Sequence, residues 1–455
     1  MRSKTKLYPH QQEAVDKLMG VRVGALYMEQ GTGKTRTALE LIARRMAAGK
    51  VNHIIWLCPC NALEDISDNI HFHADLDSGS LTMCGIETLS SSVRANEYLR
   101  SLVAEKQCFL VVDESLLVKN PYALRTQNIT RLAEQCRYKL ILNGTPISRT
   151  AADLFSQWYL LDWRILGYRS YWSFAANHLE YDECTNRIRR VLHLDYLTDK
   201  IAPYTYQITK AECLDLPPKR FATHLFDLTH EQYEHYAEVA DQLMLGLDVL
   251  PPEAVYRLFS GTQSVAAGRF VHADGPHIHT EPYFASPWDN PRVPVLLDLL
   301  DSDDKAIIYC KYTSEIEDVC RVLCDTYGAG AAVRFDGDIS RKMRRHNIKQ
   351  FRGSSPFLVA NRNCAGYGLN LQYCHHIIYY NNDWDLATRL QSEDRVHRLG
   401  QEHEVIIDDI IANGTIEVRI ADCLARKTNM LDSFNGELSS RNKIIDAIFS
   451  REGAA

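Results

Sequence analysis

The stretch that decides the fold of this chain is Val23-Gly-Ala-Leu-Tyr-Met28-Glu-Gln-Gly31-Thr-Gly33-Lys34-Thr35. An apolar run is followed by a glycine-rich loop and then by a helical pattern that continues to Ala48 and stops at Gly49. Glycines in such a loop let backbone N–H groups wrap phosphates at the first turn of a helix. The order of strand, loop and helix therefore predicts a phosphate-binding loop in an α/β domain.

The same alternation of short apolar runs and helical patterns extends along most of the chain. Buried strands are expected at 23–28, 54–58, 109–112 and 140–142, and again at 306–310, 333–335, 357–360, 377–380 and 405–411. Strands that are separated by helical crossovers pair in parallel. The sequence therefore predicts two similar α/β domains with parallel sheets, although no sequence repeat proves the similarity.

The region between them, from residue 151 to about 300, is richer in aromatic residues and helical patterns. A helix start is expected at 228–233, and the following residues predict a hairpin with its turn around Asp274-Gly275. His272, His277 and His279 fall on that hairpin. They could be metal ligands, but solvent-exposed histidines are the far commoner explanation.

Length and composition limit the number of domains and the classes of function that this chain could have. A chain of 455 residues is too long for one core and predicts two or three domains. The net charge of -7 argues against a generally basic nucleic-acid coat, but a local positive stripe remains compatible with DNA binding. Thirteen cysteines without paired CxxC units argue against structural zinc and favour a reducing, cytoplasmic compartment. No apolar run reaches roughly eighteen residues, so we expect neither a signal peptide nor a membrane span.

Two carboxylates follow a second apolar run, in Cys108-Phe-Leu-Val-Val-Asp113-Glu114. Open α/β sheets bind ligands at the carboxyl ends of their strands. Lys34 would reach the β- and γ-phosphates, the Thr35 hydroxyl and Asp113 would hold Mg²⁺, and Glu114 would orient or deprotonate the attacking water. Acidic residues that merely end a strand are the alternative, and the nearby phosphate loop argues against it.

A third segment, 391–401, carries two arginines in Gln391-Ser-Glu-Asp-Arg395-Val-His-Arg398-Leu-Gly-Gln401. On a predicted helix, Arg395 and Arg398 share one face with Gln391. Guanidinium groups bind phosphate oxygens bidentately and stay charged, so the pair suits a polyphosphate. By itself the pair would more often be a solvated salt-bridge helix with the neighbouring acidic residues.

Segment 391–401 closely resembles the last motif of the Swi/Snf-like DNA-translocating ATPases, which belong to helicase superfamily two. Further segments resemble the family's other motifs in order along the chain: Leu7–Gln11, Ile54–Pro59, Asp113–Asn120, Leu142–Ser148, Ile307–Thr313, Arg334–Gly337, Asn361–Leu371 and Gly414–Glu417. The chain departs from the family pattern at Met28, where the strict loop pattern has glycine, and at Ser115, Leu116 and Leu386.

The resemblance implies an α/β fold with two RecA-like parallel-sheet domains and a helical insertion between them. We expect an N-terminal RecA-like ATP-binding domain at 1–160, helical insertions and the hairpin at 161–290, and a C-terminal RecA-like domain at 291–455. It also implies ATP and Mg²⁺ as cofactors and double-stranded DNA as the track. Protein partners could set the task, and no membrane is expected.

The residues that the resemblance implies fall into three groups. ATP would be bound by Gln11, Glu29, Gln30, Gly31, Thr32, Gly33, Lys34, Thr35, Gly368 and Gln391. Glu114, Arg395 and Arg398 would act in catalysis, and Thr35 and Asp113 would hold the metal. DNA would be contacted by Pro59, Thr145, Lys311, Thr313 and Arg344. The basic segment 341–352 could meet phosphates or could equally be a solvated charged surface.

Three functions remain to be weighed. The favoured one is an ATP-dependent translocase on duplex DNA. A strand-separating helicase is the alternative within enzymes and would need a wedge element. A nucleotide-switched scaffold with little turnover is the alternative from another class, and the intact Lys34, Asp113, Glu114 and arginine pair argue against it.

Overall fold

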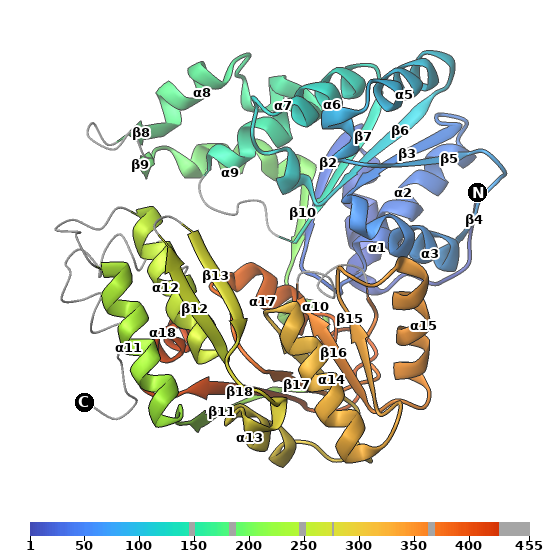
Figure 1. The fold of residues 1–455 in the computed structure, drawn as a ribbon. Helices are drawn as coiled ribbons and strands as arrows, with labels where there is room; N and C mark the ends of the chain where they lie inside the picture. The colour runs from blue at the N-terminus through green and yellow to red at the C-terminus, as the bar shows by residue number, and fades with distance from the viewer. Residues whose placement is uncertain (145–150, 182–187, 245–251, 275–276, 363–368, 427–455) are drawn as a thin grey trace. The chain divides into compact units, whose positions relative to one another are not determined.

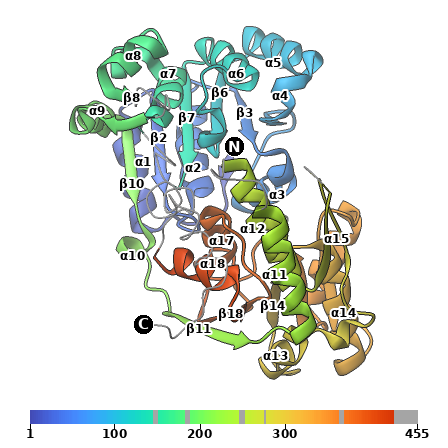
Figure 2. The same cartoon turned by 60° about the vertical axis from the view of Figure 1, so that its left-hand side comes forward.

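The computed structural model describes residues 1–144, 151–181, 188–244, 252–274, 277–362 and 369–426. The chain divides into two compact units, Met1–Asp215 and Leu216–Ala455. Each unit is built on one six-stranded sheet in which every neighbouring pair of strands is parallel (Figures 1 and 2). The predicted pair of parallel-sheet α/β domains is confirmed.

The sheet of the first unit has the strand order β10-β2-β7-β6-β3-β5. Its strands are β2 (Val23–Met28), β3 (His53–Cys58), β5 (Leu81–Gly85), β6 (Cys108–Asp113), β7 (Tyr138–Asn143) and β10 (Thr205–Ile208). The central strands are apolar at successive positions because both faces of the sheet are covered.

Helices cover the two faces of this sheet. One face packs against α1 (Pro9–Met19), α2 (Lys34–Ala47) and α3 (Leu63–His73). The other packs against α4 (Thr88–Ser91), α5 (Val93–Glu105), α6 (Leu124–Glu134), α7 (Ala152–Leu166), α8 (Tyr171–His178) and α9 (Leu194–Ile201). The first unit also contains the short elements β1 (Arg2–Ser3), β4 (Ala74–Asp75), β8 (Leu179–Tyr181), β9 (Ile188–Val191) and α10 (Lys210–Cys213).

The sheet of the second unit has the strand order β11-β18-β17-β14-β16-β15. Its strands are β11 (Lys219–Phe226), β14 (Ala306–Cys310), β15 (Ala332–Phe335), β16 (Phe357–Asn361), β17 (His376–Tyr379) and β18 (Val405–Ala412). The helices of this unit are α11 (His230–Met244), α12 (Pro252–Ala266), α13 (Arg292–Asp298), α14 (Thr313–Tyr327), α15 (Arg341–Arg352), α17 (Leu386–Glu393) and α18 (Ile416–Ala425).

Local capping explains where several of these helices begin. The Ser92 hydroxyl accepts a 3.2 Å bond from the Ala95 N–H at the start of α5. Ser340 does the same for α15, where its hydroxyl lies 3.2 Å from the Met343 nitrogen. Such side-chain oxygens satisfy N–H groups that the first helical turn leaves unpaired.

The segment 161–290, predicted as helical insertions, contributes to both units. It supplies β10, which pairs with β2 in the first unit, and β11, which pairs with β18 in the second. Neither strand was expected from the sequence. The helix expected at 228–233 is present as α11, which begins at His230.

The predicted hairpin is confirmed as β12 (Arg269–Asp274) paired with β13 (His277–Pro282). Asp274 pairs with His277, and Gly275 and Pro276 lie outside the described residues. His272 and His279 are exposed, and His272 lies 3.0 Å from the Glu281 carboxylate. Within the described ranges no group of three or more His, Cys, Asp or Glu side chains could hold a metal ion.

None of the helices in the described part of the chain combines the length and the apolar character that crossing a bilayer requires.

Candidate functional site

The phosphate-loop stretch adopts the predicted strand, loop and helix. Met28 ends β2 and is fully buried, and α2 begins at Lys34. Gly31 and Gly33 have φ angles of 84° and 92°, in the region that side chains disfavour. The Lys34 side chain is 9% exposed, and its Nζ donates to the Met28 carbonyl at 2.9 Å. Thr35, the second residue of α2, is half-buried.

Gln11 holds the loop from outside. Its Nε2 donates to the Thr32 carbonyl at 3.1 Å, and its Oε1 accepts from the Tyr8 N–H at 3.2 Å. A Cβ atom on Gly33 would lie 2.1 Å from the Gln11 Nε2, so any larger residue here would displace this amide. His10 Nε2 lies 2.8 Å from the same Thr32 carbonyl. Sequence reasoning missed His10, whose one signal was its place next to Gln11 in the opening motif.

A surface groove of about 500 Å³ lies beside the first turns of α1 and α2. It is lined by Ser3, Lys6, Leu7, Tyr8, Pro9, Gln12, Arg36 and Glu40. The Arg36 guanidinium is buried and donates to the Thr5 carbonyl at 2.7 Å and to Glu40 at 3.0 Å, which makes this wall rigid. Its volume is in the range of small-ligand sites.

The two carboxylates lie at the same sheet edge as the loop. Asp113 ends β6 and pairs in register with Leu142 of β7, while Tyr27 of β2 pairs with Asn143. The pKa of Asp113 is raised to about 7, mainly by burial and also by the Glu114 charge, while the Lys34 charge opposes both. The predicted loop lysine and the predicted metal ligand are therefore electrostatic neighbours.

Glu114 occupies a strained position at this edge. Its φ and ψ angles are 52° and 55°, a left-handed conformation that is unusual for a residue other than glycine. The Gln30 amide of the loop donates to its Oε1 at 3.0 Å. Strain of this kind gathers at functional sites. The loop and the candidate catalytic carboxylate are thus in direct contact.

The departure from the family pattern at Ser115 has a structural partner. Its side chain is fully buried, and the hydroxyl donates to the Gln157 Oε1 at 2.6 Å. Gln157 lies on α7, so this contact ties the end of β6 to the neighbouring helix. The carboxylate of Glu29, a residue expected to bind ATP, accepts a 2.7 Å bond from the Lys210 N–H.

The prediction that Arg395 and Arg398 share a helical face is wrong. Helix α17 ends at Glu393, so Gln391 lies in its last turn and both arginines follow it in turns. Val396, just beyond the end of α17, is fully buried in the core of the second unit. The Arg395 carbonyl accepts from the Leu371 N–H at 3.1 Å, which fixes the new path.

The two arginines still influence each other. The pKa of Arg398 is lowered to about 10, mainly by burial and also by the Arg395 charge, while the Asp394 charge opposes both. Arg398 Nη1 donates to the Asn370 carboxamide oxygen, whereas its Nε is buried and has no hydrogen-bond partner among the described residues. A guanidinium whose charge is raised in energy by burial and by a like charge favours an anionic ligand.

Glu393, an acidic residue close in sequence to the two arginines, forms ion pairs with other cations. Its carboxylate lies 2.8 Å from Arg389 on the same helix and 2.8 Å from Lys219 of β11. Arg389 in turn bonds Asp409 of β18 at 2.6 Å and stacks 3.5 Å from the Tyr379 ring centroid. Sequence reasoning missed Arg389, although it is the arginine that anchors α17 to its sheet.

The residues expected at DNA differ in their surroundings. Pro59 directly follows β3, and Thr313 is the half-buried first residue of α14. Arg344 is half-buried, and its Nε donates to the Ile339 carbonyl at 3.2 Å. Thr145, and likewise Gly368 of the ATP group, lie outside the described residues.

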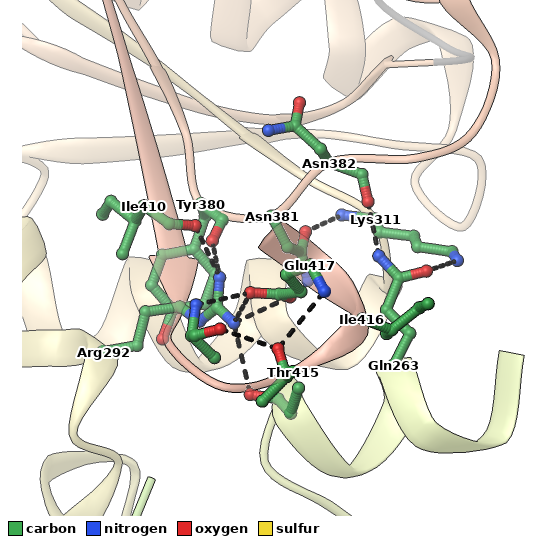
Figure 3. A network of polar contacts seen from close by, with 12 residues as sticks. Gln263, Arg292, Lys311, Tyr380, Asn381, Asn382, Ile410, Thr415, Ile416 and Glu417 are labelled. Atoms are coloured by element: carbon green, nitrogen blue, oxygen red, sulfur yellow. Dashed lines mark hydrogen bonds and ion pairs between the residues drawn. The ribbon is translucent and has the colours of Figure 1, made fainter. Parts of the chain in front are cut away.

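Lys311 belongs to an internal polar network (Figure 3). Its Nζ donates to the Gln263 Oε1 at 2.6 Å and lies 3.6 Å from the Asp383 carboxylate. Burial lowers its pKa, and the Asp383 charge opposes that shift. The ammonium is therefore directed at partners inside the second unit.

The Gly414–Glu417 motif forms the other half of the network in Figure 3. Both Glu417 carboxylate oxygens accept from Arg292 Nη2, at 2.9 and 2.8 Å. Arg292 is fully buried, and its Nη1 donates to the Tyr380 carbonyl and, at 3.1 Å, to the Ile410 carbonyl. Thr415 caps α18 beside them. This motif therefore holds the second unit together.

Two known protein domains match this chain, one after the other along the sequence. Residues 10–266 match the SNF2-related domain, and residues 291–400 match the helicase conserved C-terminal domain. The first match covers more than half of the 455-residue chain. The chain belongs to the SNF2-related family.

Individual relatives are distant. The Zorya protein ZorD of Escherichia coli is 26% identical over 71% of this chain and 30% of its own length. The ATP-dependent helicase YqhH of Bacillus subtilis, itself uncharacterized, is 22% identical over 94% of this chain and 80% of its own length. The CHD3-type chromatin-remodeling factor PICKLE of Arabidopsis thaliana is 24% identical over 73% and 24%.

The chain spans between 19% and 35% of the length of the first five curated relatives that it matches. Among solved structures, the SWI2/SNF2 ATPase core of Sulfolobus solfataricus in complex with dsDNA is 20% identical, with a TM-score of 0.42 over 99% of this chain and 98% of that one.

Proposed function

We propose that this chain is an ATP-dependent motor that hydrolyses ATP and moves along double-stranded DNA. The observation that carries the proposal is the contact between the phosphate loop and the strand-end carboxylates in the first unit. Gln30 donates to Glu114 at 3.0 Å, and Lys34 and Asp113 are electrostatic neighbours at the same sheet edge. Membership of the SNF2-related family supports the same chemistry.

The residues fit a nucleotide with a divalent cation. Gly31 and Gly33 carry positive φ angles, in a loop that leads directly into the first turn of α2, where backbone N–H groups can bind phosphate. The buried Asp113 carboxylate has a raised pKa, so a cation beside it would relieve the cost of its charge. Magnesium would neutralise charge that grows on the phosphates during transfer.

In this proposal each residue has one task. Lys34 holds the phosphates, Thr35 and Asp113 hold the cation, and Glu114 orients the attacking water. The groove beside Gln11 accepts the adenosine. From the second unit we assign Arg395 and Arg398 to the developing charge on the phosphate, because a buried guanidinium with a lowered pKa gains from an anion.

We further propose duplex DNA as the track and protein partners that set the task. Contacts to the DNA backbone would give affinity with little sequence preference. A cytoplasmic location fits the eleven cysteines that the structure describes, all of which are free thiols.

The test is the ATPase rate with no nucleic acid, single-stranded DNA, duplex DNA and RNA. Duplex should stimulate turnover most, and ATP should drive displacement of a third strand from a triplex while a forked duplex stays paired. Efficient fork unwinding without triplex displacement would support a strand-separating helicase. Stimulation by RNA alone would exclude the translocase. Tight nucleotide and DNA binding without turnover would support a scaffold.

A further inference from the structure

Helix α15 carries the most concentrated positive charge in the second unit. Six of its twelve residues are Lys or Arg and none is Asp or Glu, in a chain whose net charge is -7. The exposed basic side chains are Arg341, Lys342, Arg345, Lys349 and Arg352. A charge of one sign on a surface of the opposite overall sign creates a local field that attracts anions.

The orientation of α15 is fixed by its inner face. Phe351 is fully buried, and the buried Asn347 carboxamide donates to the Arg334 carbonyl of β15 at 2.8 Å. Figure 1 shows α15 beside β15, the strand at one end of the sheet order. Because these contacts set the rotation of the helix, the opposite face is held toward solvent.

Four of the exposed cations lie along one side of the helix. At about 100° per residue, Arg341, Arg345, Lys349 and Arg352 fall within an arc of roughly 80°. With a rise of about 1.5 Å per residue they span roughly 16 Å of helix. We call Arg341, Arg345, Lys349 and Arg352 the basic stripe. Duplex DNA carries one negative charge per about 1.7 Å of its axis, so several phosphates fall within this span.

Among the described residues, two acidic side chains beside β15 are paired with an arginine of that strand. Glu317 and Asp336 each lie 2.8 Å from Arg334, whereas Asp338, just before α15, is exposed. Lys305 adds a further cation at the helix end, where its Nζ donates to the Gly353 and Ser355 carbonyls, each at 3.1 Å. Cations at a helix C-terminus are favourable for the helix itself.

The chemistry of the stripe favours nucleic acid over an acidic protein. Protein interfaces usually have an apolar centre, and the exposed apolar residue of α15, Met343, lies away from the stripe by its place in the helical repeat. Interfaces with DNA are polar and strongly positive. Arg344, the residue expected at DNA from the motif, is half-buried and bonds the Ile339 carbonyl instead.

We propose that the basic stripe of α15 binds the phosphate backbone of duplex DNA and gives the chain a sequence-independent hold on its track. This inference rests on the proposed function only for the choice of duplex DNA. The hold is electrostatic, so it weakens with salt by counterion release. It does not involve any residue that we assign to the nucleotide.

The test compares three triple variants of the full chain. Arg341→Ala/Lys349→Ala/Arg352→Ala removes charge from the stripe. Arg341→Lys/Lys349→Arg/Arg352→Lys keeps every charge. The matched control is Arg94→Ala/Arg100→Ala/Arg131→Ala, which removes three exposed arginines from helices of the first unit and changes the net charge equally.

Binding of a fluorescent duplex is measured by anisotropy between about 50 and 200 mM salt. In the charge-removing stripe variant the slope of log affinity against log salt should become shallower by about 0.9 per lost phosphate contact. Its affinity near 0.1 M salt should fall roughly a hundred-fold. The charge-keeping variant and the first-unit control should bind as wild type does, and ATPase without DNA should be unchanged in all three.

Equal loss in the stripe variant and the control would overturn the inference, because only net charge would then matter. The inference would also be overturned if binding of poly-L-glutamate depended on the stripe while binding of duplex DNA did not. Failure of wild type to bind duplex, with intact ATP turnover, would reject duplex DNA as the track. If all variants bound duplex DNA as wild type does, only the assignment of the basic stripe as the binding surface would be rejected.

Discussion

Replacing Gly33 by alanine tests the geometry of the phosphate loop directly. The substitution adds a Cβ atom at a residue whose φ angle is +92°, and that atom would lie 2.1 Å from the Gln11 Nε2. Two separate costs follow. The backbone must hold alanine in a left-handed conformation, and the Gln11 amide must leave its bond to the Thr32 carbonyl.

Each of these effects has a typical free-energy cost. A left-handed conformation costs a residue with a Cβ about 1–2 kcal/mol. The lost Gln11 bond is worth about 0.5–1.5 kcal/mol. Gly33→Ala should therefore lower the free energy of unfolding by roughly 2–3 kcal/mol. Gly49→Ala is the matched control, because Gly49 has a φ of +66° and a Cβ there would meet nothing within 4 Å. It should cost only the conformational part, about 1–2 kcal/mol.

Urea unfolding of Gly33→Ala, Gln11→Ala and the double variant separates the free-energy cost of the clash with Gln11 from the cost of the left-handed backbone conformation. In the Gln11→Ala background, Gly33→Ala should cost about as much as Gly49→Ala does. The coupling energy between the two sites should then be about 0.5–1.5 kcal/mol. If Gly33→Ala costs no more than Gly49→Ala in the wild-type background, the close approach of Gln11 to the loop is refuted.

Three further substitutions address catalysis and stability. Lys34→Ala should abolish ATP turnover and Glu114→Gln should stop hydrolysis while ATP binding persists; wild-type turnover in either variant would exclude this site. Arg398→Ala should lower kcat by roughly 10³–10⁵ with a smaller effect on ATP binding, and an unchanged steady-state kcat would give this arginine a structural role. Glu417→Gln should lower the free energy of unfolding by about 3–5 kcal/mol, because Arg292 loses its charge partner in the interior. A loss below about 1 kcal/mol in urea unfolding would contradict that account.

Most of the strands that the sequence predicted are buried on both faces. Their apolar runs are nearly continuous, so β2, β3, β6 and β7 are easily recognised in the sequence. In the two large sheets the strands that it missed are β5, β10 and β11, which lie at the ends of their sheets. In β11 most side chains are exposed or half-buried, so the apolar signal is absent and only pairing with β18 reveals the strand.

The ATP-site residues of the first unit could be predicted because their chemistry depends on local order along the chain. A strand, a glycine-rich loop and a helix place Lys34 without knowledge of the rest of the fold. The arginine segment could not be placed in this way. Its polar spacing is helical, yet the helix ends at Glu393. Beyond that point Val396 is buried and the Arg395 carbonyl pairs with the Leu371 N–H, so the local path involves residues outside the segment.

A motif match identifies a position, whereas the surroundings decide what the side chain does there. Lys311 matches a motif expected at DNA, but its ammonium is 2.6 Å from the amide oxygen of Gln263. Gln263 lies on α12 and is fully buried, so both ends of its amide need partners. Its Nε2 donates to the Asn382 carbonyl at 2.6 Å, and Lys311 satisfies the other end. These two bonds tie α12 to the segments that carry Lys311 and Asn382, so Lys311 has a structural partner inside the second unit, while its contact with DNA stays a prediction.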